Sequence, residues 1–316
     1  MIRILCISLL ISSSLAFTLN SIVQRQSKIT NYSKRPCKPS LFMSNDTPTP
    51  IEVIPRRWLK STKQLATLGP ASSTVEMIEK LFLSGADIFR LNFSHGEHSE
   101  KANLIKLIRS IEAKYNHPIA ILADLQGPKL RVGTFEGDKV VLVEGQKFTF
   151  DLNEELGNSY RVRLPHTEIL NTLRKDDVLL LDDGKLKMKV VETTMKAEGA
   201  NGKVVCEVVI GGSLSNRKGV NTPSIILPIS PLTPKDRKDL DFILTLDVDW
   251  VALSFVQKAE DIAELKSIIS ASKTNNNLKV MAKLEKPSAI QSLDEIIDLS
   301  DGMIYNFKLY TTYIHC

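Results

Sequence analysis

Residues 88–125 read IFRLNFSHGEHSEKANLIKLIRSIEAKYNHPIAILADL and decide the fold class. Two apolar runs, at 88–93 and 119–125, have the length of strands, and the segment 99–115 between them has apolar residues at helical spacing. Both expected strands are almost continuously apolar, which is typical of parallel strands buried on both faces. The stretch therefore predicts a strand, a helix and a second, parallel strand.

The same alternation continues on both sides of this stretch. A helix is expected at 73–84, with Ser73 and Glu76 at capping-box spacing, and another opens at Thr233 with Pro234 in its first turn. Further helices are expected at 259–272 and 287–299. Six strands are expected, at 62–68, 88–93, 119–125, 250–256, 279–284 and from about 303. Because a closed (β/α)₈ TIM barrel needs eight strands, we predict an incomplete α/β barrel.

The pattern changes between 134 and 227. Short segments that alternate apolar and polar residues are separated by polar or glycine-bearing turns, which is typical of antiparallel strands. These segments are 139–144, 147–152, 178–182, 186–191 and 203–210. We therefore predict a small antiparallel β-barrel B domain at 134–227, inserted between barrel parts at 57–133 and 228–304.

Charge is distributed unevenly along the 316 residues. The chain has 41 Lys and Arg against 36 Asp and Glu, but residues 1–45 have six basic residues and no acidic one. The remainder has a net charge of −1, so it lacks the basic footprint of a nucleic-acid-binding protein, and we expect no nucleic-acid partner. The four cysteines show no disulfide framework.

The N-terminal segment has the composition of a targeting sequence. Arg3 precedes an apolar run and small residues, which predicts a signal peptide at 1–17, and 18–50 is a transit-like presequence rich in Ser, Asn and basic residues. The order is similar to the bipartite presequence of algae with secondary plastids. We expect a plastid location and no membrane span in the mature form; the secretory pathway, or the cytosol if the start is mispredicted, are the alternatives.

Charged residues follow the expected barrel strands, where barrel enzymes place their active sites. Arg90, Arg131 and Lys283 are suited to phosphate or carboxylate oxygens, and Asp124 and Glu285 offer hard oxygen ligands for Mg²⁺. Taken alone, each of these residues would be interpreted as a solvated or ion-paired side chain with no role in catalysis. Together they indicate a barrel enzyme with an anionic substrate and a metal.

Five motifs resemble the pyruvate kinase family in order and context, over about 57–304. They are 62–72 (TKQLATLGPAS), 90–96 (RLNFSHG), 124–131 (DLQGPKLR), 217–221 (RKGVN) and 282–287 (AKLEKP). The resemblance implies a barrel A domain interrupted by a mobile B domain and followed by a C-terminal domain. It also implies transfer of a phosphoryl group from phosphoenolpyruvate to ADP, giving pyruvate and ATP, with Mg²⁺ and, by family, K⁺ as cofactors.

The resemblance also implies roles for individual residues. Arg90 would bind the phosphoenolpyruvate phosphate, Lys283 would stabilise the phosphoryl group in transfer, and Glu285 would be a Mg²⁺ ligand. The expected substrate- and nucleotide-binding residues are Arg90, Asn92, His95, Arg131, Lys218 and Ser254. The turn at 182–184 would face the nucleotide from the B domain.

The expected monovalent-cation pocket departs from the family's potassium-dependent members. Its residues are Asn92, Ser94, Asp124 and Leu125, and members that need K⁺ have Thr at position 125 and Glu at position 129. This chain has Leu125 and Lys129, as in potassium-independent members. The Lys129 ammonium would supply the charge of K⁺, so we expect K⁺ to be dispensable.

The resemblance stops at 304. Residues 305–316 (YNFKLYTTYIHC) do not match the family's next segment, which holds a second Mg²⁺-binding Asp. We interpret 305–316 as an aberrant tail, with the last barrel strands and the C-terminal domain absent, and expect little or no kinase activity. A homotetramer is expected of the full-length family but not of this fragment. The alternatives are a catalytically dead fragment or splice isoform that binds only nucleotide or a partner, and a metal-dependent 2-oxo-acid barrel lyase.

Overall fold

The computed structural model describes residues 5–6, 60–194, 202–223, 225–274 and 277–305. The expected signal peptide apart from 5–6, the transit-like presequence and residues 306–316 of the expected tail lie outside the described residues, so the structure does not test them. Tyr305, the first residue of that tail, is the last residue of a strand.

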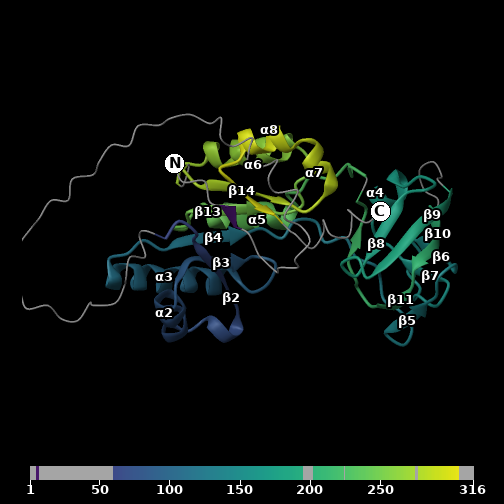
Figure 1. The fold of residues 1–316 in the computed structure, drawn as a ribbon, viewed down its shortest axis with the longest axis horizontal. Coiled ribbons are helices and arrows are strands. Elements are labelled where there is room, and N and C mark those ends of the chain that lie inside the picture. Colours follow the sequence, from purple (N-terminus) through teal and green to yellow (C-terminus); the bar gives the residue numbers. More distant parts are fainter. Residues whose placement is uncertain (1–4, 7–59, 195–201, 224, 275–276, 306–316) are drawn as a thin grey trace, which may run out of the picture. The chain divides into compact units, whose positions relative to one another are not determined.

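The barrel part, drawn in Figure 1, is one parallel sheet. All six expected strands are present and pair in parallel, in the order β15-β14-β13-β4-β3-β2, and Leu5–Cys6 (β1) pairs in parallel with β15. The six strands are β2 Gln64–Leu68, β3 Ala86–Asn92, β4 Ala120–Asp124, β13 Trp250–Leu253, β14 Lys279–Leu284 and β15 Gly302–Tyr305. This order confirms an incomplete α/β barrel.

Helices follow the strands as predicted. They are α2 Val75–Leu83, α3 His98–Tyr115, α5 Pro234–Ile243, α6 Ala259–Ala271, α7 Pro287–Gln291 and α8 Leu293–Leu299, with a 3₁₀ turn at Pro70–Ser72. Helix α2 packs against α3 and β3, and α6 packs against β14 and α8.

The sheet is apolar on both faces, as near-continuous apolar strands require. On one face, Phe89, Ile121, Val251 and Val280 join the helices in the main hydrophobic cluster. The opposite, inner face has its own small cluster. That cluster consists of Ile88, Leu122, Ala252 and Met281, one from each of four adjacent strands.

The inserted unit has its own sheets and its own hydrophobic cluster, which includes Phe148, Phe150 and Val204. Six strands pair in the order β12-β8-β9-β10-β6-β7, and β11 pairs with β5. The strands are β5 Lys139–Leu142, β6 Lys147–Asp151, β7 Arg161–Arg163, β8 Val178–Leu181, β9 Leu186–Thr194, β10 Lys203–Ile210, β11 Gly212–Ser215 and β12 Val220–Asn221. The domain limits at 134 and 227 stay a prediction.

The insert differs from the prediction in two respects. Its strands are not all antiparallel, because β7 pairs in parallel with β6. A short helix, α4 Thr167–Thr172, follows β7 and buries Ile169 and Leu170. Segments of three and six residues are too short to show a period in the sequence.

Two predicted helix features were wrong. Thr74, not Ser73, caps α2, because its side chain accepts a hydrogen bond from the Met77 N–H. The helix expected at 287–299 is two helices that meet at Ser292, whose backbone is not helical (φ −107°, ψ 28°). Serine favours such a break because its hydroxyl competes for backbone hydrogen bonds.

The remaining expectations concern membranes and cysteines. None of the helices in the described part of the chain has the length and apolar composition that a bilayer crossing requires. Cys206 is a free thiol inside the insert's cluster, and burial raises the pKa of this thiol to about 12.

Candidate active site

The inner face of the sheet changes from apolar to polar toward the carboxyl ends of the strands. Alternate residues of a strand share a face, so the side chain two positions after each inner apolar residue also lies on the inner face. The inner apolar residues, one on each strand, are Leu65, Ile88, Leu122, Ala252 and Met281. The residues two positions after them are, in the same order, Thr67, Arg90, Asp124, Ser254 and Lys283. Strand alternation alone therefore gathers five polar side chains from five adjacent strands.

Arg90 and Asp124 form a partly buried ion pair in this group. Both Nε and Nη2 of Arg90 donate to Oδ2 of Asp124, with an Nε–Oδ2 distance of 2.7 Å, and Nη1 donates to the Thr67 hydroxyl at 3.0 Å. The Asp124 side chain is only 2% exposed. Such a paired guanidinium has a fixed orientation, which suits it to bind an oxyanion.

Lys283 lies at the centre of the group. Its Nζ donates to the Ser254 hydroxyl at 2.8 Å and lies 3.1 Å from Oε1 of Glu285 and 3.4 Å from Oδ1 of Asp124. The Ser254 hydroxyl in turn donates to the Leu125 carbonyl at 2.7 Å. The ammonium is thus held by partners from three strand ends.

Glu285 is oriented by the backbone of Phe255. The Phe255 N–H donates to Oε2 of Glu285 at 3.1 Å, and Phe255 adopts a left-handed conformation with φ +63°. That conformation is uncommon for a bulky residue and marks a backbone held in place by its surroundings. It directs one N–H at the carboxylate that was expected to bind metal.

The residues of the expected monovalent-cation pocket lie along the loops after β3 and β4. Oδ1 of Asn92 accepts the Ser94 N–H at 2.9 Å, and the Leu125 carbonyl belongs to the Lys283 network. Partial desolvation and the like charges of Arg131 and Lys235 lower the pKa of Lys129.

The sequence prediction missed Lys235, from the first turn of α5. Its Nζ donates to the Phe93 carbonyl at 2.7 Å and pairs with Asp239 at 2.5 Å. Phe93 and Lys235 are 142 positions apart in the sequence, so no local pattern indicates this contact.

Arg131 and Lys218 lie on neighbouring backbone segments where the chain enters and leaves the insert. The Val132 N–H donates to the Lys218 carbonyl at 2.9 Å, and Arg131 and Gly219 form an isolated antiparallel β-bridge. The Lys218 ammonium pairs with Asp182 at 2.9 Å. Hydrogen bonds from Lys185 and then Lys218 lower the pKa of Asp182.

Arg131, Lys218 and His95 are not among the partners of Lys283. The backbone at Arg131 pairs with the backbone at Gly219, next to Lys218. His95 is exposed in the loop after β3. The structure therefore brings together Arg90, Asp124, Ser254, Lys283 and Glu285, and the contacts of this group do not include His95, Arg131 or Lys218.

The carboxylates of this group fit a magnesium ion only in part. Glu285 is partly exposed, and Oδ1 of Asp124 is buried without a hydrogen-bond partner. Over the described residues, no group of three or more His, Cys, Asp and Glu side chains could hold a metal. Because Mg²⁺ is usually bound by one or two carboxylates with water and substrate oxygens, Glu285 is compatible with such a site.

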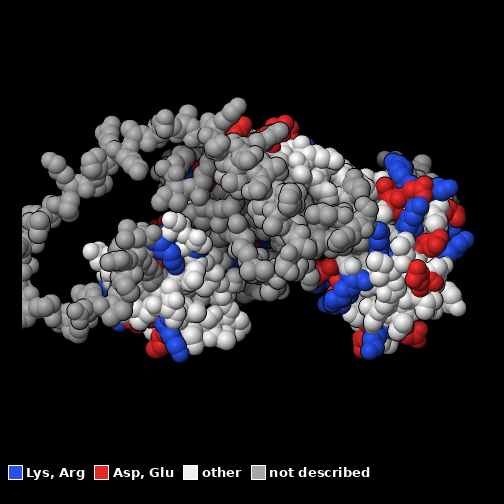
Figure 2. All heavy atoms as spheres, in the orientation of Figure 1, with Lys and Arg blue, Asp and Glu red and all other residues white. Residues whose placement is uncertain are grey.

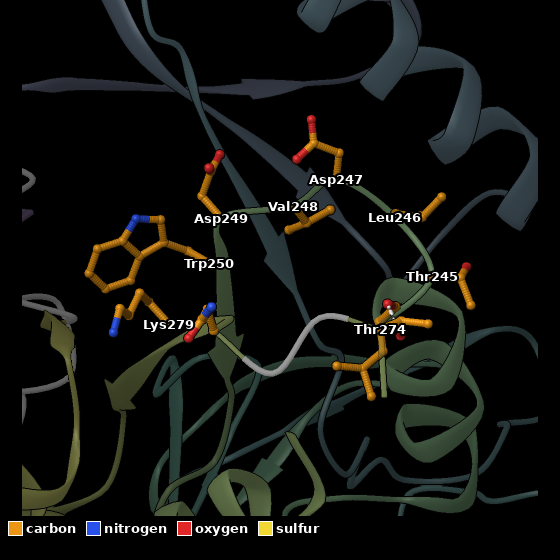
Figure 3. A pocket seen from close by; sticks show the side chains of 10 residues that line it. Thr245, Leu246, Asp247, Val248, Asp249, Trp250, Thr274 and Lys279 are labelled. Atoms are coloured by element: carbon orange, nitrogen blue, oxygen red, sulfur yellow. Dashed lines mark hydrogen bonds between the residues drawn. The ribbon is translucent and has the colours of Figure 1, made fainter. Parts of the chain in front are cut away.

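A cavity of about 590 Å³ lies at the other ends of the strands (Figure 3). It is lined by Trp250 and Lys279, the first residues of β13 and β14, and by Asp247 and Asp249. Both carboxylates already pair with Arg109, at 2.8 and 2.9 Å. Since barrel enzymes act at the carboxyl ends of their strands, this cavity is not the candidate active site.

Charge is mixed on the visible face of the inserted β unit (Figure 2). On the face shown in Figure 2, Lys and Arg are interspersed with Asp and Glu over the inserted β unit. Mixed charge of this kind is typical of a solvated surface.

The fold and the site define a class: a parallel α/β barrel with an inserted β domain, and a cation–carboxylate group at its catalytic end. Residues 59–306 match the family model described as "Pyruvate kinase, barrel domain". The chain belongs to the pyruvate kinase family.

Curated relatives agree with this assignment. The chain is 49% identical over 245 residues to a pyruvate kinase of Methylorubrum extorquens, which covers 78% of this chain and 49% of that protein. It is 40% identical over 253 residues to pyruvate kinase 2 of Synechocystis, covering 79% and 41%. The chain thus spans about half the length of the curated relatives it matches.

A solved structure agrees as well. A pyruvate kinase from Cryptosporidium parvum has a TM-score of 0.72 and 28% sequence identity, over 80% of this chain and 53% of that one. The family assignment leaves the alternative of a metal-dependent 2-oxo-acid barrel lyase without support.

Proposed function

We propose that the protein transfers a phosphoryl group from phosphoenolpyruvate to ADP, which yields pyruvate and ATP. One observation carries the proposal: the Lys283 ammonium is held among Asp124, Ser254 and Glu285 on the inner face of the barrel. Phosphoryl transfer develops negative charge on the transferred group, and fixed cations stabilise that charge. A cation held from three strands needs little rearrangement to do so.

The other residues divide between the two substrates. Arg90, oriented by Asp124, would bind the phosphate of phosphoenolpyruvate, and Ser254 would orient Lys283. Nucleotide binding would fall to Asn92, His95, Arg131 and Lys218.

Magnesium is proposed as the cofactor, with Glu285 as its protein ligand. The ion would neutralise substrate phosphate oxygens, which is its usual contribution to phosphoryl transfer. The Phe255 N–H would keep the Glu285 carboxylate in place.

Potassium is proposed to be dispensable. Lys129 lies among the charges of Arg131, Lys235 and Asp236, in the loop after β4, and adds a fixed positive charge there. Activity measured in K⁺ and in tetramethylammonium should therefore be equal. Strong activation by K⁺ in the wild-type protein would contradict this proposal.

The activity is tested by replacing the central lysine in a full-length form, because little or no kinase activity is expected of the 316-residue chain itself. Lys283→Met should lower kcat for pyruvate formation by about 10²–10³-fold, as removal of one oriented group that stabilises the transition state does. Lys279→Met is the matched control, because it removes a lysine from the other end of the same strand. The measurement is pyruvate release in a coupled assay with phosphoenolpyruvate, ADP and Mg²⁺.

Three outcomes are informative. Loss in Lys283→Met alone supports the proposal, and equal rates in both variants refute the role of Lys283. A wild-type chain that binds Mn²⁺ and ADP without turnover would favour the binding-only alternative.

Location and assembly are also proposals. We propose that residues 1–50 direct the protein to a complex plastid, and a cytosolic signal from a fluorescent fusion of residues 1–45 would contradict it. A homotetramer is proposed for a full-length member, with sedimentation velocity as its measurement.

A further inference from the structure

Lys286, directly after Glu285, is a lysine buried in the interior. It is 1% exposed, at the N-terminus of α7. Its Nζ donates to the Ile225 carbonyl at 3.0 Å and to Oε1 of Gln257 at 2.9 Å, and lies 4.5 Å from the centre of the Phe255 ring. A buried ammonium is costly unless such partners compensate for lost water, so its position depends on all three.

Gln257 binds the same segment of chain as Lys286. Its Oε1 accepts the Leu227 N–H at 3.0 Å, and its Nε2 donates to the Leu227 carbonyl at 3.0 Å. Gln257 is itself 1% exposed, on the turn between β13 and α6. Both of its amide atoms and the Lys286 ammonium are therefore used to hold residues 225–227.

Residues 225–227, which we call the return segment, connect the insert to the barrel. Ile225 and Leu227 pack in the hydrophobic cluster of the insert, whereas Leu232, five positions later, packs in that of the barrel. Any movement of the return segment would remove the acceptor that Ile225 offers to Lys286.

Phe255 links this arrangement to the candidate active site. Its ring lies against the Lys286 ammonium and packs on the cluster of the insert, while its N–H donates to Glu285. One residue thus contacts the carboxylate through its backbone and the buried lysine through its side chain.

We propose that Lys286 is a positioning residue. Together with Gln257 and Phe255 it holds the return segment against the ends of β13 and β14, and these contacts orient Glu285. Lys286 acts through other groups and touches no substrate. The proposal deepens the proposed function, on which it rests in one respect: that Glu285 binds a divalent metal.

The first test is hydrogen exchange of single backbone amides in the full chain. Lys286→Met keeps the length of the side chain and removes the ammonium, so exchange at Leu227 and Phe255 should be at least about tenfold faster. Lys258→Met is the control, since Lys258 is an exposed lysine next to Gln257. It should leave both amides unchanged.

The second test is Mn²⁺ binding, followed from the electron paramagnetic resonance signal of the free ion. Lys286→Met should weaken Mn²⁺ binding about five- to tenfold, and Lys258→Met should not. Gln257→Met removes the amide that hydrogen-bonds Leu227 and Lys286 and should reproduce both effects, which keeps the proposal testable if one variant fails to fold.

The outcomes separate this proposal from the proposed function. Unchanged exchange at Phe255 in a folded Lys286→Met protein refutes the coupling, as does faster exchange at Leu227 with unchanged Mn²⁺ binding. If the wild type binds no Mn²⁺, the proposed role of Glu285 as a metal ligand is wrong. Hydrogen exchange at the Phe255 amide then decides by itself whether Lys286 positions Glu285.

Discussion

One residue beside the candidate active site, Phe255, has an uncommon backbone conformation. Among the described residues, seven other than glycine have a positive φ, and five of these are Asn or Asp, which tolerate it. Phe255 is aromatic and has no such tolerance. It retains this conformation beside Glu285 and Lys286, where strain of this kind is commonly retained for function.

Lys286 should make the stability of the protein depend on pH. Burial lowers the pKa of Lys286 from 10.5 to about 8, and Asp261 opposes the shift. Between these values the unfolded chain binds the extra proton, so the free energy of unfolding should rise with pH, by up to about 1.4 kcal/mol per unit. The rise should begin near pH 8 and end near 10.5.

The measurement is urea unfolding of the wild type and Lys286→Met between pH 7.5 and 10.5. Other lysines titrate in this range, so the difference between the two proteins is the relevant quantity. Parallel stability curves would show that Lys286 does not titrate as its burial requires.

At the scale of elements, the start of α5 joins a helix cap to a barrel loop. Oδ2 of Asp236 accepts the N–H and the hydroxyl of Thr233, which is a capping box. Its Oδ1 accepts the N–H groups of Gln126 and Gly127, at 2.9 and 3.2 Å, from the loop after β4. A single buried carboxylate therefore orders two segments.

Asp236→Ala should destabilise the protein by about 3 kcal/mol. The change leaves the buried N–H groups of Gln126 and Gly127 without an acceptor, at about 1–3 kcal/mol for each unsatisfied group. Asp241→Ala, an exposed position of the same helix, should change stability by less than about 0.5 kcal/mol. Chemical denaturation measures both, and equal losses would mean that helix propensity, not the Asp236 contacts, decides the effect.

At the scale of the molecule, the described chain has two substantial cores. Phe89 is fully buried in the barrel cluster, and Phe148 is fully buried in the cluster of the insert. The two clusters share no residue, and Phe255, which follows β13 of the barrel sheet, packs against the cluster of the insert. Such an arrangement favours local unfolding of one part without the other.

Truncation of either phenylalanine should therefore act within its own part. Phe148→Ala and Phe89→Ala should each cost about 3–5 kcal/mol, because each leaves a cavity in a close-packed core. Hydrogen exchange should accelerate in β6, β9 and β10 for the first and in β3 and β4 for the second. Equal acceleration throughout by both variants would instead indicate one cooperative unit.

Much of the fold could be predicted because its signals are local. Near-continuous apolar strands indicated a buried parallel sheet, and all six are present. Ser292 and β7 could not be predicted, since a helix break and a three-residue parallel strand depend on neighbours distant in the sequence. The cap of α2 was misplaced by one residue, because Ser73 and Thr74 are both good caps and only packing chooses between them.

The sequence by itself determined the barrel class, the family and the strand ends that hold Arg90, Lys283 and Glu285, because periodicity and motifs are properties of neighbouring residues. Only the tertiary structure decided that Lys235 reaches Phe93 and that Lys286 is buried against residues 225–227. Lys286 lies 61 positions from Ile225. Whether such a lysine is solvated or buried depends on which segments the sheet brings beside it, and no local pattern contains that information.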